Sequence, residues 1–268
     1  MKIILSRKGF DYENGGIASP IFEDRTLLSF PIPSQWDYYE FEDLEYKGKT
    51  CLELLNDLKY RQGIEQCHFD PDLDETKCSI KRPGWEPAFG PSGTAHSYLK
   101  NNGVEVGDLF LFFGTFHFVE EVDGHYRYVK KTGDFYKDND LHIIWGYMQV
   151  GEMVSDWDEI QRRLYWHPHA APWQEGSTIY TAPKVLTFDK NKPGAGLLTF
   201  DKKRVLTLEG ATKATWKKNA VYDIENIKSK KKNSAKDPSI GIYYKGIWQE
   251  LVLAESDGCT AWAKSMIE

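Results

Sequence analysis

The stretch "DLFLFFGTFHFVEEV" (residues 108–122) decides the fold class. It is aromatic and apolar along most of its length and carries one glycine, a composition typical of a strand with a bend. Two similar stretches follow it, "HYRYVKK" (125–131) and "LHIIWGYMQVGEM" (141–153). We therefore expect an α+β protein built on a mostly antiparallel sheet or a partial barrel, with a few peripheral helices.

Helix signals lie on either side of these strands. The clearest is "TCLELLNDLKYRQG" (50–63), where Thr50 and Glu53 match the reciprocal capping pattern and Gly63 lies beyond the end. Three further helices are predicted to begin at Ser92, Ser155 and Thr260.

Composition and charge limit the function classes. The chain has 34 Lys and Arg against 40 Asp and Glu, and its net charge of −6 gives no global attraction to DNA or to an acidic membrane. The charge is uneven, acidic early and basic over residues 201–236. No repeat or linker divides the chain, so we expect a single domain over residues 1–268, with an exposed Lys-rich segment near 228–236.

Several common classes lack support in the sequence. The 4 cysteines form no C-x-x-C pair, and no apolar run is long enough for a bilayer or a secretory leader. We therefore expect reduced thiols, a cytoplasmic location and no membrane partner. The signatures of zinc and serine hydrolases, phosphate-loop enzymes and dinucleotide-binding domains are also missing, which disfavours those classes.

The densest polar cluster is "CHFDPDLDE" (67–75). In an extended backbone His68, Asp70 and Asp72 would point to one side. Such a set could bind a divalent cation or act as acid and base. A solvated acidic loop explains the same residues, because acidic side chains are mostly exposed.

A second polar block is "YWHPHAAPW" (165–173), which places His167 and His169 on either side of Pro168. This spacing suits a metal site or two hydrogen bonds to a phosphate. A rigid Pro-rich loop whose histidines stack on neighbouring aromatics is the structural alternative.

A third block, "PGWEPAFGPSGTAHSYL" (83–99), has Gly90, Ser92 and Gly93 before a predicted helix. Backbone N–H groups at such a start could bind an anion such as a phosphate. An ordinary turn with Ser92 as N-cap fits equally well.

The basic stretch "TKATWKKNAVY" (212–222) and the lysine run after it resemble a nucleic-acid contact, in which lysines neutralise phosphates and an aromatic ring stacks on a base. A solvated surface is the alternative. The residues assigned to this contact are Trp216, Lys217, Lys218, Lys230 and Lys231.

The first polar block is "SRKGFDYENGG" (6–16), just after an apolar run. Arg7 and Asp11 could form a charge pair that holds the turn. They could also form a polar shelf at a strand end, where loops carry function.

Several of these blocks, in order along the chain, resemble the third nucleotide-modification-associated domain family of bacteria and bacteriophages. They are "MKIILSRKGFDYENGGIASPIF", "FDPDL", "GWEPAFGPSGTAHSYL", "GDLFLFFGTF", "LHIIWGYMQVGE", "HPH" and "PGAG", and they span residues 1–200. The family takes its name from a suspected link to modified bases and brings no established reaction.

The resemblance implies which polar residues line the site. Arg7 and Lys8 would hold a phosphate, and Asp70 or Asp11 would be a base or metal ligand. The two histidines of "HPH" would be acid, metal ligand or substrate clamp. The matching positions are Arg7, Lys8, Asp11, Asp70, His142, His167 and His169.

Three functions stay open, with a nucleotide or DNA as partner and a divalent cation as the one cofactor considered. The first is an enzyme acting on a nucleotide or DNA base by group transfer or hydrolysis, with the polar blocks in one cleft. The second is a reader resembling PUA-like barrels, which would hold a base among Phe113, Phe116 and Trp145. The third is a metal-dependent nuclease or phage-defence effector using Asp70 and Asp72.

Overall fold

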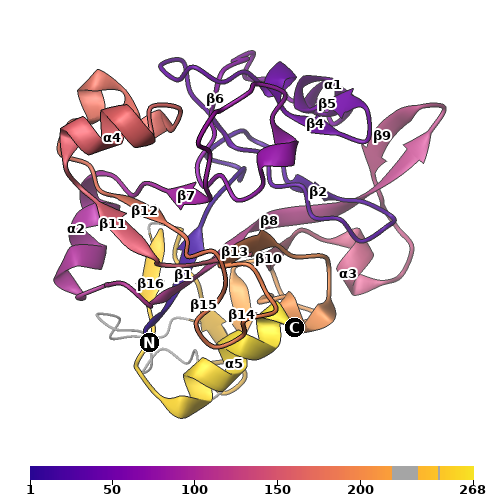
Figure 1. The fold of residues 1–268 in the computed structure, drawn as a ribbon. Coiled ribbons are helices and arrows are strands. Elements are labelled where there is room, and N and C mark those ends of the chain that lie inside the picture. The colour runs from indigo at the N-terminus through magenta and orange to yellow at the C-terminus, as the bar shows by residue number, and fades with distance from the viewer. Residues whose placement is uncertain (219–234, 247) are drawn as a thin grey trace.

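Figure 1 shows the fold in a computed structural model that describes residues 1–218, 235–246 and 248–268. Lys230 and Lys231, with most of the Lys-rich segment, lie outside these residues. The helices of the described part are α1 (Cys51–Asp57), α2 (Gly93–Asn101), α3 (Phe135–Asp138), α4 (Trp157–Arg163) and α5 (Asp257–Ile267). Its strands are β1 (Ile3–Arg7), β2 (Ser19–Ile21), β3 (Ile32–Pro33), β4 (Glu45–Tyr46), β5 (Lys49–Thr50), β6 (Cys67–His68), β7 (Ala88–Phe89), β8 (Leu109–Val122), β9 (His125–Tyr128), β10 (Leu141–Gln149), β11 (Glu152–Val154), β12 (Ile179–Thr181), β13 (Ala195–Leu197), β14 (Thr215–Lys217), β15 (Gly241–Tyr243) and β16 (Glu250–Val252).

The main sheet has the order β13-β10-β8-β1-β16, and β2 and β9 also pair with β8. It is mixed, because β1 and β2 run parallel to β8 while the other pairs are antiparallel. The expected antiparallel character therefore holds only in part. Within the described residues the sheet stays open between β13 and β16, so the predicted partial barrel, PUA-like or otherwise, is not found.

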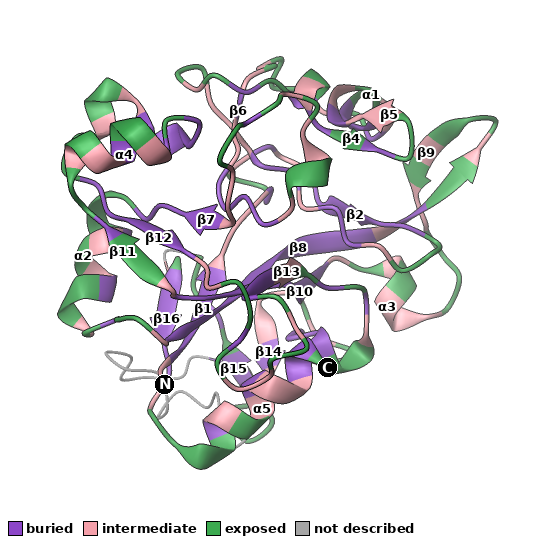
Figure 2. Cartoon of the chain, viewed as in Figure 1, coloured by how far each residue is buried: buried purple, intermediate pink, exposed green. Residues whose placement is uncertain are grey.

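Burial on both faces explains why β8 is central. Leu111 and Phe113 pack in one core cluster, to which α5 contributes Met266. Phe110 and Phe112, which alternate with them along the strand, pack in the cluster on the opposite face. Figure 2 shows β8 buried along most of its length. A strand covered on both faces reads as a continuous apolar run and pairs readily in parallel.

The strand predictions at residues 108–122, 125–131 and 141–153 are confirmed as β8, β9, and β10 with β11. Smaller antiparallel sheets surround the main one, β11-β12-β7, β14-β15, β3-β6 and β4-β5. The sheet β3-β6 and the strand β7 matter for the site, because His68 ends β6, Gly90 follows β7, and both residues line a cavity together with Arg7 of β1.

The helix predictions hold with shifted starts. The capping pair at the start of α1 is formed as expected, with Thr50 accepting from the N–H of Glu53. The N-cap of α4 is Asp156 instead of Ser155, and α5 begins one turn before Thr260 because Ser256 caps it. None of the helices within the described residues has the length and apolar character that a bilayer crossing requires.

Candidate functional site

One cleft collects polar segments that lie far apart in the sequence, and we call it the central cleft. It lies at the end of β1, between the loop after β6, the turn after β7 and the 3-10 helix η3 (Pro168–Ala170). Its polar lining includes Arg7, Lys8, Asp11, Asn14, His68, Asp70, Ser92, His169 and Gln249.

Two histidines from distant segments meet on one side of this cleft. Nε2 of His68 lies 3.2 Å from Nε2 of His169. On the other edge of the His68 ring, Nδ1 lies 3.1 Å from both carboxylate oxygens of Asp37. Burial alone lowers the pKa of His68, but the Asp37 hydrogen bond and the charges of Asp70 and Asp37 raise it above its usual value.

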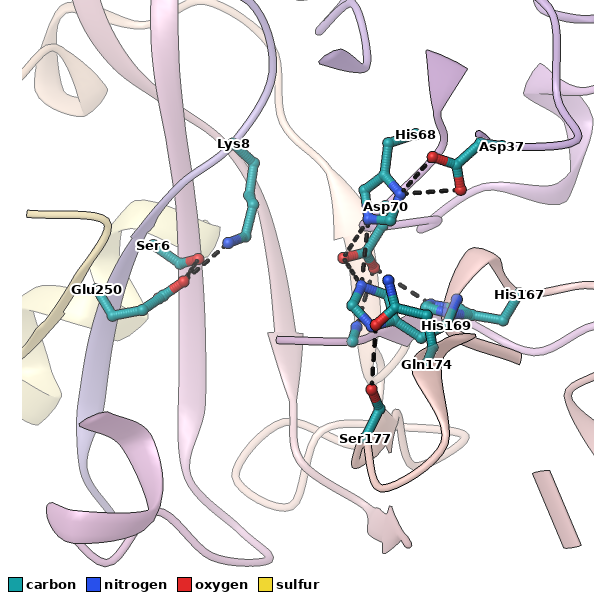
Figure 3. Close-up of polar contacts among 11 residues, drawn as sticks. Ser6, Lys8, Asp37, His68, Asp70, His167, His169, Gln174, Ser177 and Glu250 are labelled. Carbon is teal, nitrogen blue, oxygen red and sulfur yellow. Dashed lines mark hydrogen bonds and ion pairs between the residues drawn. The ribbon is translucent and has the colours of Figure 1, made fainter. Parts of the chain in front are cut away.

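Asp70 lies between His68, His167 and His169, as Figure 3 shows, and its carboxylate is buried. Its Oδ1 accepts the backbone N–H of Gly90 at 3.0 Å and lies 3.2 Å from Nε2 of His167. Its Oδ2 faces the Nε2 atoms of His68 and His169, each at 3.8 Å. Burial raises the pKa of Asp70, but the hydrogen bond and charge of His167 and the charges of His169 and His68 lower it to about 2.

The "HPH" block orients its rings through a 3-10 turn instead of an extended strand. His167 is the N-cap of η3, and its Nδ1 accepts the backbone N–H of His169 at 3.1 Å. This bond leaves the proton of a neutral His167 on Nε2, which faces Asp70. Burial lowers the pKa of His169 to about 3, so its ring is neutral near pH 7.

Gly90 makes the close approach of these rings possible. A Cβ at this position would lie 2.7 Å from Cγ and Cδ2 of His169 and 2.9 Å from Cε1 of His167. Only glycine leaves room for both imidazoles beside a backbone N–H that binds Asp70. The small residues of the third block therefore matter through Gly90, while Ser92 lines the cleft and Gly93 begins α2 away from the cleft lining.

The two cations at the end of β1 are paired. Arg7 lies 2.8 Å from Oδ2 of Asp11, whose Oδ1 accepts the N–H groups of Glu13 and Asn14. Asp11 thus holds the turn as well as the ion pair, and its assignment as a catalytic residue stays a prediction.

Lys8 bends toward Glu250 and Ser6 in Figure 3. Its Nζ lies 2.8 Å from Oε1 of Glu250, which also accepts the hydroxyl of Ser6 at 3.1 Å. Burial raises the pKa of Glu250, and the Lys8 charge opposes this.

The remaining sequence candidates lie elsewhere. Asp72 pairs with Ala88 through its backbone, and its carboxylate binds Arg82 and the indole N–H of Trp85, so it does not join Asp70. His142 is buried under Trp216, whose indole N–H it accepts at 2.9 Å. Its place in the core explains why the sheet brings it near neither Asp70 nor the "HPH" histidines.

The aromatic candidates are core residues. Phe113 belongs to the cluster with Trp216, whereas Phe116 and Trp145 belong to the cluster on the other face of the sheet. Trp145 also borders a second cavity that shares Asp70 and Gly9 with the central cleft. The three rings therefore do not enclose one pocket.

The basic contact is only partly placed. Trp216 is fully buried and stacks on Tyr244 with ring centroids 4.6 Å apart, so its faces are not free for a base. Lys217 Nζ donates to the carbonyl of Lys202, and Lys218 donates its backbone N–H to Ile240. Contact of these lysines with nucleic acid stays a prediction.

An exposed aromatic groove, which the sequence reading missed, borders the site from another side. It is lined by Trp36, Tyr38, Tyr165 and Trp173, and also by Asp37 and His167. Trp36 and Trp173 are 78% and 64% exposed. A groove with rings open to solvent is suited to stacking on planar ligands.

Asp37 and Glu250 are the other residues that the sequence reading left without a site role, and the role of Gly90 differs from the expected one. Asp37 stands among aromatic residues with no motif around it, so no local signal marks it. Gly90 does carry a signal, because it precedes a predicted helix, but that pattern pointed to anion binding instead of ring clearance.

The comparisons with known proteins add one finding. A family profile described as nucleotide modification associated domain 3 matches residues 2–254. No curated protein and no solved structure matches the chain.

Proposed function

The chain belongs to the nucleotide modification associated domain 3 family, and from this premise we propose that it is an enzyme acting on a nucleotide or on a base in DNA, by group transfer or hydrolysis. One observation carries the proposal. The central cleft is lined by polar side chains from four separate segments. These are the end of β1, the loop after β6, the turn after β7 and η3. Convergence of acid–base groups and cations in one concave site is the usual mark of an active site.

The charges in the cleft suit a phosphorylated substrate. Lys8 and Arg7 lie on the β1 side and the Asp70 group lies on the opposite side. Both cations are paired in this structure, with Glu250 and Asp11. A bound phosphate would therefore share each cation with a carboxylate, and binding would weaken as salt rises.

The aromatic groove supports a substrate that contains a base. Its exposed tryptophans, Trp36 and Trp173, offer ring faces to a base. The groove is also lined by Asp37, which contacts His68, and by His167, which contacts Asp70. His68 and Asp70 in turn line the central cleft. Stacking of a base on such a ring contributes about 1–3 kcal/mol.

The other two functions receive less support. A reader with Phe113, Phe116 and Trp145 around a base would need these rings in one pocket, and they pack on two faces of the sheet. A nuclease using Asp70 and Asp72 would need the two carboxylates together, and Asp72 is held by Arg82.

The test blocks the cleft without touching its buried groups. Ser92, the N-cap of α2, is exposed at the lip of the cleft, and Ser97 is exposed on α2 outside the cleft lining. Ser92→Trp should abolish binding of the responsive ligands in a titration of deoxynucleoside monophosphates and short single-stranded DNA. Ser97→Trp, the matched control, should bind like the wild type.

Two results would contradict the proposal. One is that neither a nucleotide nor DNA binds the wild type. The other is that Ser92→Trp binds as tightly as Ser97→Trp, which would place binding outside the central cleft.

A further inference from the structure

We infer that His68, Asp70 and His169 form a binding site for a divalent transition-metal ion, with zinc the best fit, and with one coordination position open to the central cleft. Among the described residues these three form a His/Asp group whose ligand atoms lie within 4.8 Å of one another. The inference goes beyond the proposed function, because it concerns a metal and not the substrate.

The distances between the three ligand atoms match a metal ion. The two Nε2 atoms are 3.2 Å apart, and each is 3.8 Å from Oδ2 of Asp70. The nearest point equidistant from all three lies in their plane about 2.1 Å from each, and an ion displaced slightly out of this plane keeps all three distances close to the length of a bond from zinc to nitrogen or carboxylate oxygen. Tetrahedral coordination at this bond length separates ligand atoms by about 3.4 Å, a value between the two observed separations.

The surroundings of the three residues leave the correct atoms free to coordinate. Nδ1 of His68 faces both oxygens of Asp37, so a neutral ring keeps its proton on Nδ1 and its lone pair on Nε2, which points to the other ligands. A carboxylate behind a histidine is the common second-layer partner of metal-binding histidines. The oxygen of Asp70 that Gly90 and His167 hold is Oδ1, which leaves Oδ2 for the metal.

The kind of ligand selects the kind of ion. Two imidazole nitrogens with one carboxylate suit zinc or a neighbouring transition metal, whereas magnesium and calcium prefer oxygen ligands throughout. Three protein ligands leave one position of a tetrahedron unfilled, as in catalytic zinc sites. This position faces the central cleft, since all three ligands are part of the cleft lining together with Lys8 and Ser92. An ion there would bind a water or a substrate oxygen.

A hydrogen bond between the two imidazoles is the competing explanation. It accounts for the 3.2 Å separation of the Nε2 atoms, but it leaves Oδ2 of Asp70 beyond hydrogen-bond distance of both rings. A metal ion accounts for all three separations at once.

The experiment uses the full chain, freed of metal by chelation and then titrated with Co²⁺ and with Zn²⁺. Cobalt in a four-coordinate site gives strong visible absorption, and zinc should displace it. We expect one equivalent per chain. His68→Ala and His169→Ala should each weaken binding by at least about 100-fold, since even second-layer changes weaken it 10–100-fold.

The matched control is His117→Ala. His117 also pairs through Nδ1 with a carboxylate, Asp140 at 2.7 Å, but its Nε2 contacts a backbone carbonyl instead of a second histidine. This variant should keep the full equivalent. Circular dichroism shows whether each variant is folded.

Absence of binding to the wild type would overturn the inference, as would full binding in folded His68→Ala and His169→Ala. If these variants fail to fold, X-ray absorption of zinc bound to the wild type decides, because the site predicts two imidazole ligands and any other number overturns it. Nucleotide binding by metal-free protein is a separate measurement, so a failed metal site would leave the proposed function standing.

Discussion

Nε2 of His68 and Nε2 of His169 lie 3.2 Å apart, although 101 residues separate the two histidines in the chain. The end of β6 supplies one ring and the turn of η3 supplies the other. The turn after β7 passes between the two segments, and its Gly90 donates to Asp70 while contacting the rings of the "HPH" block. The geometry of the pair therefore depends on a position that has no side chain.

Gly90→Ala should disrupt the site while the protein still folds. The added methyl group would meet the His167 and His169 rings at less than 3.0 Å, and overpacking of this kind costs about 1–3 kcal/mol. We expect a lower melting temperature and at least about tenfold weaker Co²⁺ binding. Ser97→Ala, exposed on α2 outside the cleft lining, is the control and should change neither. Unchanged Co²⁺ affinity in Gly90→Ala would show that the rings move aside freely.

Asp37→Asn should weaken metal binding without removing a ligand. The amide cannot accept the His68 N–H with a negative charge, so the ring becomes a poorer donor to the metal, by about 10–100-fold in affinity. Asp140→Asn changes the equivalent partner of His117 and should leave the affinity unchanged. If Asp37→Asn and Asp140→Asn bind the metal equally tightly, Asp37 does not support the metal site.

The sequence predicts the elements of this protein better than their pairing. The composition of β8 predicts a strand, and the pattern of Thr50 and Glu53 predicts the N-terminal cap of α1. Whether β8 pairs in parallel with β1 depends on a partner about a hundred residues away, and the local pattern carries no such information. The apolar run on both sides of residue 111 did carry a signal, because such runs are typical of strands buried on both faces.

The same limit applies to the site, because local sequence indicates candidate residues but not which of them meet in the fold. Local sequence patterns identified Asp70, His167 and His169, since Asp70 lies in the densest polar cluster and the two histidines flank Pro168. They could not separate Asp70 from Asp72, because the Asp72 carboxylate is held by Arg82 and Trp85, and the local spacing does not encode these contacts. Asp37 reaches His68 only through tertiary packing, which no motif encodes.

We predict that Asp11 stabilises the turn that follows it. Its Oδ1 accepts two backbone N–H groups, so Asp11→Ala should lower the free energy of unfolding by about 1–3 kcal/mol in urea denaturation. Asp11→Asn keeps an oxygen for these donors and should lose less than half as much. An equal loss in the two variants would assign the stability to the ion pair with Arg7 instead. Retention of full nucleotide turnover by Asp11→Asn would also contradict a role as base.

Lys8 and Glu250 should be strongly coupled. Lys8→Met would leave the Glu250 carboxylate buried without its cation, a change that destabilises by about 3–5 kcal/mol. The double variant Lys8→Met/Glu250→Gln should regain most of this free energy, because no buried charge is then left unpaired. Additive losses in the double-mutant cycle would mean that the two side chains do not interact. The folded double variant also tests phosphate binding, which should weaken if Lys8 contacts the substrate.

His142 should make the protein sensitive to mild acid. Burial, together with the charges of Lys213 and Arg7, lowers its pKa to about 3, although the charge of Asp140 opposes them. In the unfolded chain a histidine titrates near 6.5, so between these values the unfolded state binds a proton that the folded state does not. Stability is therefore lost as pH falls through this window, by about 2 kcal/mol from pH 7 to pH 5 for this residue.

His142→Asn isolates that contribution. The amide oxygen of asparagine can replace Nδ1 as acceptor of the Trp216 indole N–H, and the side chain does not titrate. Urea denaturation of both proteins at pH 7 and pH 5 gives the comparison, and acid effects shared by the two chains cancel in the difference. The wild type should lose about 2 kcal/mol more than the variant between the two pH values. Equal losses would mean that His142 takes up its proton in the folded state near its ordinary pKa, which a ring buried against Trp216 and Phe113 should not do.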